Sequence, residues 1–185
     1  MNESMKRRGD GFGLIEVLIA LVVMSIGLLG IAKMEGLALA STGVASMRSL
    51  AAIEASSLAS AMHANTAYWA AGLAPASFTV SATATGPSIS DPTLAAAADC
   101  TSASGGAQPY CTPARTAGYD VQQWGAALQA LLPNYQATVN CSTVVGTPVT
   151  CTIQIAWAEK TVAINAQSVN GPAMQAPTYP LYVQP

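Results

Sequence analysis

The feature that most constrains this chain is an apolar run close to its start. From Leu14 to Ala32, every position is apolar or glycine except Glu16 and Ser25. As an α-helix, which rises about 1.5 Å per residue, the run extends roughly 28 Å and matches the hydrocarbon thickness of a membrane. Taken alone, this length and composition are typical of a transmembrane anchor or of the apolar core of a cleaved signal peptide.

Two details argue against both of these plain interpretations. A carboxylate such as Glu16 inside an apolar helix costs about 2.5–3.5 kcal/mol on membrane insertion, so it is usually tolerated because it finds a partner. The segment before the run is short and polar and carries a basic cluster at residues 6–8. The sequence therefore favours a more specialised helix.

Gly11, Phe12 and Glu16 have the spacing of a known leader. Here the chain resembles the class III leader of type IV pilins and pseudopilins, in which a short basic segment ends in glycine, followed by a cut, a phenylalanine and a glutamate four residues further on. Asp10 departs from this pattern, because many such leaders carry a basic residue there. The resemblance implies that a prepilin peptidase removes residues 1–11 and methylates the new amino terminus of Phe12. It also implies that Glu16 pairs with the α-amino group of a neighbouring subunit.

Shorter patterns narrow the resemblance to minor pilins of the PilV family, also called type IV pilus modification proteins. They lie at residues 25–32, 59–65, 119–124 and 157–159, and residues 74–116 are not covered. The resemblance implies a minor pilin that assembles with other minor pilins and primes polymerisation of the major pilin at the pilus tip. Before assembly the chain would lie in the inner membrane with a periplasmic domain. The alternatives are a minor pseudopilin of a type II secretion system and a membrane-tethered, adhesin-like protein.

We expect an α+β fold of the type IV pilin kind, with one long N-terminal helix packed on a small antiparallel sheet. Four segments are predicted: a leader at 1–11, the hydrophobic half of the helix at 12–34, its amphipathic half at 35–65, and a periplasmic globular domain at 66–185. The amphipathic half carries an apolar stripe at helical period. That stripe consists of Leu37, Val44, Ala51 and Leu58, with Ala40, Met47 and Met62 on neighbouring rows.

Composition narrows the function further. Charged residues make up 9% of the chain, against about 25% in an average soluble protein, which suits a surface largely packed against neighbours. No basic patch remains beyond the leader, so nucleic-acid binding is not expected. The sequence has no nucleophile–histidine pair, glycine-rich phosphate loop or carboxylate pair, and its one histidine, His63, is expected to be a solvated helix-end residue. We therefore expect no enzyme, no cofactor and no metal site.

The four cysteines all follow the apolar run. The basic cluster at residues 6–8 should stay cytoplasmic, which places the cysteines in an oxidising compartment where three pairings are possible. Alternating apolar positions around Cys141 and Cys151 predict two strands joined by a turn at residues 146–148. The inner faces are Val139, Cys141, Thr143 and Val145 on one strand, and Cys151, Ile153, Ile155 and Trp157 on the other. This hairpin favours a Cys141–Cys151 disulfide, and by elimination a Cys100–Cys111 disulfide.

Capping and edge signals predict the remaining elements. Asp91 and Pro92 indicate a short helix running into residues 95–98, within an otherwise irregular segment from 66 to 118. Asp120, with Gln123 three residues on, predicts the start of a second helix that ends at Pro133. Its apolar face would be Trp124, Leu128, Leu131 and Leu132. Trp124 and Trp157 are interpreted as core residues rather than as a sugar-binding groove. A strand is expected at 162–166, and a last strand, at a sheet edge, at 179–184.

Overall fold

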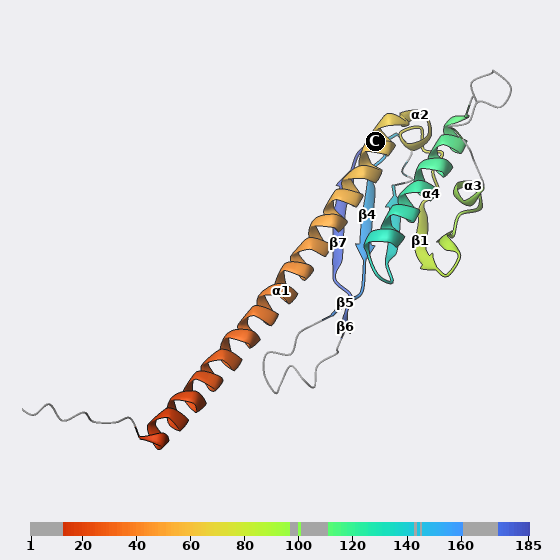
Figure 1. Cartoon of the computed structure of the whole chain (residues 1–185). Coiled ribbons are helices and arrows are strands. Elements are labelled where there is room, and N and C mark those ends of the chain that lie inside the picture. Colours follow the sequence, from red (N-terminus) through yellow and green to blue (C-terminus); the bar gives the residue numbers. More distant parts are fainter. Residues whose placement is uncertain (1–12, 97–99, 101–110, 143, 145, 161–173) are drawn as a thin grey trace, which may run out of the picture. The chain divides into compact units, whose positions relative to one another are not determined.

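A computed structural model describes residues 13–96, 100, 111–142, 144, 146–160 and 174–185. The chain divides into two units, Met1–Thr42 and Gly43–Pro185. One helix, α1 (Leu14–Ala64), contributes residues to both units (Figure 1). Its bounds agree closely with the predicted helix from residue 12 to residue 65, because no proline interrupts this stretch.

The part of α1 in the first unit exposes its apolar side chains. From Leu14, which is 90% exposed, to Met34, at 71%, none of the large apolar side chains is buried by the protein. Within the part of the chain that the structure describes, α1 is the one helix long and apolar enough to cross a membrane, with a mean hydropathy of 2.7 over an 18-residue window. Such a helix needs lipid or other helices around it.

The second unit is built on a five-stranded antiparallel sheet in the order β2-β1-β3-β4-β7. Its strands are β1 (Ser77–Thr83), β2 (Gly86–Ile89), β3 (Gln136–Cys141), β4 (Cys151–Ala156) and β7 (Thr178–Val183). A short ribbon pairs β5 (Glu159–Lys160) with β6 (Met174–Gln175). The long helix and this antiparallel sheet form the predicted α+β, type IV pilin-like architecture.

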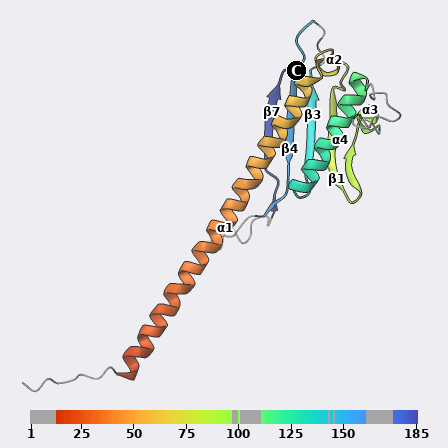
Figure 2. The same ribbon diagram turned by 45° about the horizontal axis from the view of Figure 1, so that its top comes forward.

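Two helices cover one face of the sheet, as Figure 2 shows: residues 43–64 of α1, and α4 (Pro113–Leu131). Their apolar sides meet the inner sheet face in a single core. From α1 the core receives Ala51, Ala55, Leu58 and Met62; from α4, Val121, Trp124 and Leu128; and from the sheet, Phe78, Val80, Val139, Ile153 and Ile155. The predicted stripe is confirmed at Ala51, Leu58 and Met62.

The predicted hairpin is confirmed. β3 and β4 pair antiparallel with Cys141 opposite Cys151. The alternation along β4 buries Cys151, Ile153 and Ile155 and leaves the side chains between them more exposed. β7 pairs with β4 at the sheet edge, with Pro180 in the strand, as the sequence predicts. The other predicted positions on the first hairpin strand, residues 143 and 145, and the strand expected at 162–166 lie outside the described residues.

Two short helices flank the sheet. α2 (Thr66–Trp69) buries Tyr68 and Trp69 at the end of α1. α3 (Pro92–Ala95) begins where the capping signal predicts, because Asp91 Oδ1 accepts hydrogen bonds from the backbone N–H groups of Thr93 and Leu94, both at 3.0 Å. The helix ends at Ala95, and Ala96 is already extended, so the predicted run into residues 95–98 is wrong at Ala96; residues 97 and 98 lie outside the described residues.

The start predicted for α4 at Asp120 is wrong. The helix begins two turns earlier, at Pro113, where the hydroxyl oxygen of Thr112 accepts a hydrogen bond from the backbone N–H of Arg115. Thr112 followed by Pro113 is itself a strong start signal, since proline fits the first helical position. Asp120 therefore lies inside the helix rather than at its cap. Leu131, predicted on the apolar face, is 40% exposed, whereas Leu132 at the helix end is buried.

The segment from 66 to 118, predicted to be irregular apart from one short helix, contains two strands. β1 buries Phe78 and Val80, while the residues that follow each of them, Thr79 and Ser81, stay partly exposed. This period-two alternation is short, and small residues make up much of the strand, which explains why the sequence pattern does not predict a strand here. Gly86, with a φ of +138°, turns the chain from β1 into β2. Both strands contact α4, and they are the strands of the sheet that lie closest to it.

Candidate functional site

The amino-terminal residues singled out by the sequence fall at the start of α1. Gly11 and Phe12 lie outside the described residues. Glu16 lies in the first helical turn, where its backbone N–H bonds the carbonyl of Gly13 at 3.0 Å, and its side chain is exposed. A carboxylate in the first turn is favoured by the helix dipole. Among the described residues no cation pairs with Glu16, so its carboxylate is available to a neighbour.

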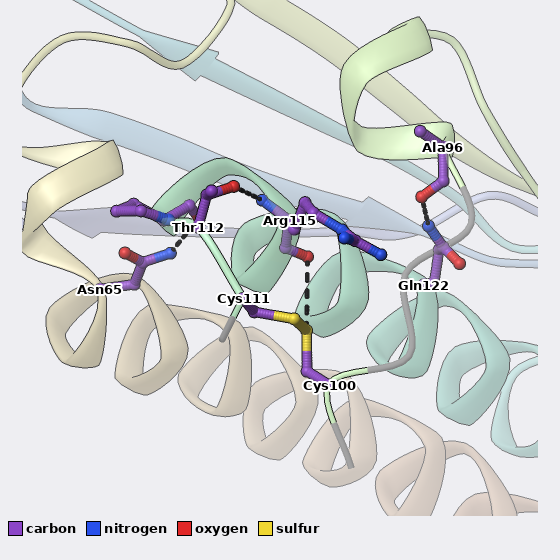
Figure 3. The surroundings of a disulfide bond; sticks show 8 residues. Asn65, Ala96, Cys100, Cys111, Thr112, Arg115 and Gln122 are labelled. Atoms are coloured by element: carbon purple, nitrogen blue, oxygen red, sulfur yellow. Dashed lines mark hydrogen bonds between the residues drawn. A yellow bond between two sulfur atoms is a disulfide. The ribbon is translucent and has the colours of Figure 1, made fainter. Parts of the chain in front are cut away.

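The cysteines are joined in the two predicted pairs. Cys141 and Cys151 bridge the ends of β3 and β4 with their Cα atoms 4.0 Å apart. Cys100 and Cys111 bridge two points 11 residues apart, with Cα atoms 5.8 Å apart. Because Cys111 directly precedes the α4 cap at Thr112, this second disulfide holds Cys100 at the start of α4 (Figure 3).

Side-chain amides reinforce the junction around the second disulfide. Asn65, at the end of α1, donates through Nδ2 to the carbonyl of Pro113 at 2.8 Å, which joins α1 to the start of α4. Gln122 on α4 donates through Nε2 to the carbonyl of Ala96 at 2.8 Å (Figure 3) and to the carbonyl of Leu94 at 3.0 Å. These two bonds hold the carboxyl end of α3 against α4. These bonds fix three helix ends against one another, at positions that sequence patterns do not connect.

An open groove of about 330 Å³ lies between α1 and α4. Glu54 lines it from α1 and Asp120 from α4, although they are 66 residues apart in the sequence. Burial raises the pKa of both carboxyls above their ordinary values. The indole Nε1 of Trp124 donates to the backbone carbonyl of Glu54 at 2.9 Å and holds the two helices together beside the groove. Sequence reasoning missed this pair, because no local signal relates the two residues.

The sequence also gave no sign of an ion pair that connects α1 to β5. Arg48 donates through Nε and Nη2 to the two carboxylate oxygens of Glu159, at 3.3 and 3.1 Å. Glu159 is 3% exposed and Arg48 is 58% exposed. Such a two-point contact is the geometry that a guanidinium and a carboxylate prefer.

Residues 6–32 match the family model described as the prokaryotic N-terminal methylation motif. The chain carries the amino terminus of a pilin-type subunit. No curated protein and no solved structure matches the chain at a significant level. The matched segment contains Gly11, Phe12 and Glu16, and it ends before most of the PilV-like patterns. It supports a type IV pilin-like or pseudopilin-like protein rather than the PilV family in particular.

The pilin-type motif explains why the first half of α1 exposes apolar side chains. It indicates a structural subunit that a prepilin peptidase processes, that is anchored in a membrane, and that then assembles with other subunits. Trp124 and Trp157 lie in the core of this pilin-type domain, as predicted, with 4% and 2% of their surfaces exposed. His63 is exposed, also as predicted. Among the described residues, no group of three or more histidine, cysteine, aspartate or glutamate side chains lies close enough to hold a metal ion.

Proposed function

We propose that this protein is a minor pilin of the PilV family, which helps to prime type IV pilus assembly at the tip together with other minor pilins. The observation that carries the proposal is the methylation motif at residues 6–32 running directly into the 51-residue helix α1. The PilV-like patterns at residues 59–65, 119–124 and 157–159 support the choice of a minor pilin. The major pilin and the other minor pilins are the expected partners.

Maturation in this proposal begins at the bond between Gly11 and Phe12. A prepilin peptidase hydrolyses the bond, releases residues 1–11, and methylates the amino group of Phe12, which keeps its positive charge. Glu16 then lies four residues from this amino terminus. Opposite charges attract strongly where water is excluded, so the Glu16 carboxylate of one subunit and the amino terminus of the next set the register between neighbouring helices.

A minor pseudopilin of a type II secretion system is the second candidate, because the same motif and the same helix support it. Deletion of the gene separates the two functions. A minor pilin deletion reduces the number of surface pili and leaves protein secretion unchanged, whereas a pseudopilin deletion blocks secretion and leaves piliation unchanged. Complementation by the unaltered chain restores whichever function was lost.

Mass spectrometry of the membrane-bound and pilus-bound protein tests the maturation step. We expect the mature chain to begin at a methylated Phe12, and we expect Gly11→Ala to retain the intact leader. Gly13→Ala is the matched control, since it changes a glycine two residues further on and should leave cleavage intact. An intact leader on the unaltered protein, or a cut beyond Ala32, would contradict the pilin proposal.

A further inference from the structure

The groove between α1 and α4 runs along two turns of each helix. Its α1 wall spans residues 54–61 and its α4 wall spans residues 120–127, which is about 10 Å of each helix. Figure 2 shows the two helices side by side on one face of the sheet. The lining residues are Glu54, Ser57, Leu58 and Ala61 on α1, and Asp120, Gln123, Trp124 and Ala127 on α4. The groove therefore combines apolar walls with one carboxylate from each helix.

Within the described part of the chain, no cation pairs with either carboxylate of the groove. Among the described residues, Arg48–Glu159 is the ion pair that forms, and it uses neither of them. Burial, with no opposing contribution from a cation, raises the pKa of both Glu54 and Asp120. A partly desolvated carboxylate destabilises the fold until a cation or a proton reaches it. A positive group bound in the groove would therefore offset the cost of keeping these two carboxylates partly buried and ionised.

The chain does not supply that positive group from the two helices that form the groove. Arg115 precedes Asp120 by five residues on α4, about 140° around the helix, and its side chain is exposed. His63 follows Glu54 by nine residues on α1, which places it on the opposite side of that helix. Beyond residue 11 the sequence has seven acidic residues but only four basic ones, and Arg48 already binds Glu159. Among the side chains that the structure describes, none therefore places a cation in the groove, which leaves it open to a cation from another molecule.

We propose that this groove binds a lysine or arginine side chain presented by a neighbouring subunit. The methyl groups of Ala61 and Ala127, which are partly exposed, contact the aliphatic stem, as apolar surfaces do for long basic side chains that lie along them. Glu54 and Asp120 hold the charged end from opposite walls. The inference rests on the proposed function for the identity of the partner as a subunit, whereas the chemistry of the groove is independent of it.

The test follows the indole N–H signal of Trp124, which lies in the groove wall, by NMR of the full chain in a non-ionic detergent. The probe is the peptide acetyl-Leu-Lys-Leu-amide, and the matched control replaces its lysine by norleucine. We expect the lysine peptide to shift the Trp124 signal in a saturable way and the norleucine peptide to bind more weakly, by up to about thirtyfold, since two charge pairs contribute up to about 1 kcal/mol each. The signals of Trp69 and Trp157, both buried away from the groove lining, should not move.

Variants make the result specific to the two carboxylates. The double variant Glu54→Gln with Asp120→Asn keeps the groove's shape and should lose the preference for lysine over norleucine. Its unchanged Trp69 and Trp157 signals report that the domain stays folded. Equal binding of both peptides, an undiminished preference in the double variant, or no shift of the Trp124 signal would each overturn the proposal. Leader processing is measured separately, so a failure here is distinguishable from a failure of the pilin assignment.

Discussion

The guanidinium of Arg48 on α1 binds the carboxylate of Glu159 in β5, which lies 111 residues further along the chain and three residues past the end of β4. Glu159 is almost completely buried, and Arg48 covers it from the more exposed side. An unpaired carboxylate at that depth would be strongly disfavoured, because burial removes its hydration. The pair therefore fixes the segment that follows β4 against the long helix.

Removing only the cation of this pair should be worse than removing both charges. We expect Arg48→Ala to lower the thermal midpoint, because it leaves Glu159 buried and unpaired. Arg48→Ala combined with Glu159→Gln should recover part of that loss, since a neutral amide is less costly to bury. Thermal denaturation of the two variants beside the unaltered chain checks the order. A double variant less stable than Arg48→Ala would show that Glu159 has another role.

Gly125 lets α4 approach the sheet closely. A Cβ atom at this position would lie 2.8 Å from Cβ of Pro87 and 3.0 Å from Cγ1 of Val80. We expect Gly125→Ala to destabilise the domain by about 1–3 kcal/mol through overpacking, less about 1 kcal/mol gained in helix propensity. Gly43→Ala in α1 is the control, because its added methyl meets nothing within 4 Å. Urea denaturation showing equal stability for both variants would contradict the close approach.

The groove carboxylates make stability depend on pH. Burial raises the pKa of Glu54 and Asp120 in the folded state, so ionisation opposes folding. Below the unfolded pKa, near 4, both residues are protonated and the penalty is absent; it appears as the pH rises through the folded pKa and is complete at neutral pH.

The variant Glu54→Gln with Asp120→Asn should therefore be more stable than the unaltered chain near pH 7. Because both side chains are largely solvent-screened, we expect a gain of less than about 1 kcal/mol. The difference should vanish near pH 3.5, where the carboxyls of the unaltered chain are themselves neutral. Thermal midpoints at the two pH values measure this, and a variant advantage that grows on acidification would contradict the assigned direction.

The disulfide across the hairpin should contribute strongly to stability. Cys141–Cys151 closes a loop of 10 residues, and replacing both cysteines by serine should destabilise the domain by about 2–4 kcal/mol. Peptide mapping without reduction should recover Cys141 with Cys151 and Cys100 with Cys111. A peptide joining Cys100 to Cys141 would contradict the register of β3 and β4.

Local signals account for what the sequence predicts well. The uninterrupted helix α1, the cap at Asp91 and the alternating hairpin around Cys141 each depend on residues that are neighbours in the chain. The start of α4 was misplaced because the pair Asp120 and Gln123 resembles a capping box, although Thr112 performs that role two turns earlier. A capping pattern identifies a start only when no helix already runs through it.

Relationships over long sequence distances could not be predicted in the same way. The contact of Arg48 with Glu159, and the shared groove of Glu54 and Asp120, exist only after folding has brought α1 beside β5 and α4. No period or spacing in the chain encodes them. The leader is the opposite case, because its recognition residues lie within one short stretch of the chain and need no folded domain.

Glu16 provides the sharpest test of assembly. If its carboxylate serves to pair with a neighbour's amino terminus, Glu16→Ala should leave membrane insertion intact, since it removes a charge from an apolar helix. Cleavage should also survive, because the bond between Gly11 and Phe12 lies four residues away. Assembly should fail, because the apolar helices would retain little that fixes their mutual register.

The expected loss follows from the charge that Glu16→Ala leaves behind. Removing one partner of a buried pair costs about 3–5 kcal/mol, which lowers the association constant more than a hundredfold. Surface pilus yield, measured beside the amount of processed protein in the membrane, separates assembly from maturation. Glu16→Gln keeps the size of the side chain and removes its charge, so it should fail in the same way as Glu16→Ala. Normal piliation in both variants, with processing intact, would show that Glu16 is not an assembly contact and that its carboxylate is solvated at the membrane surface.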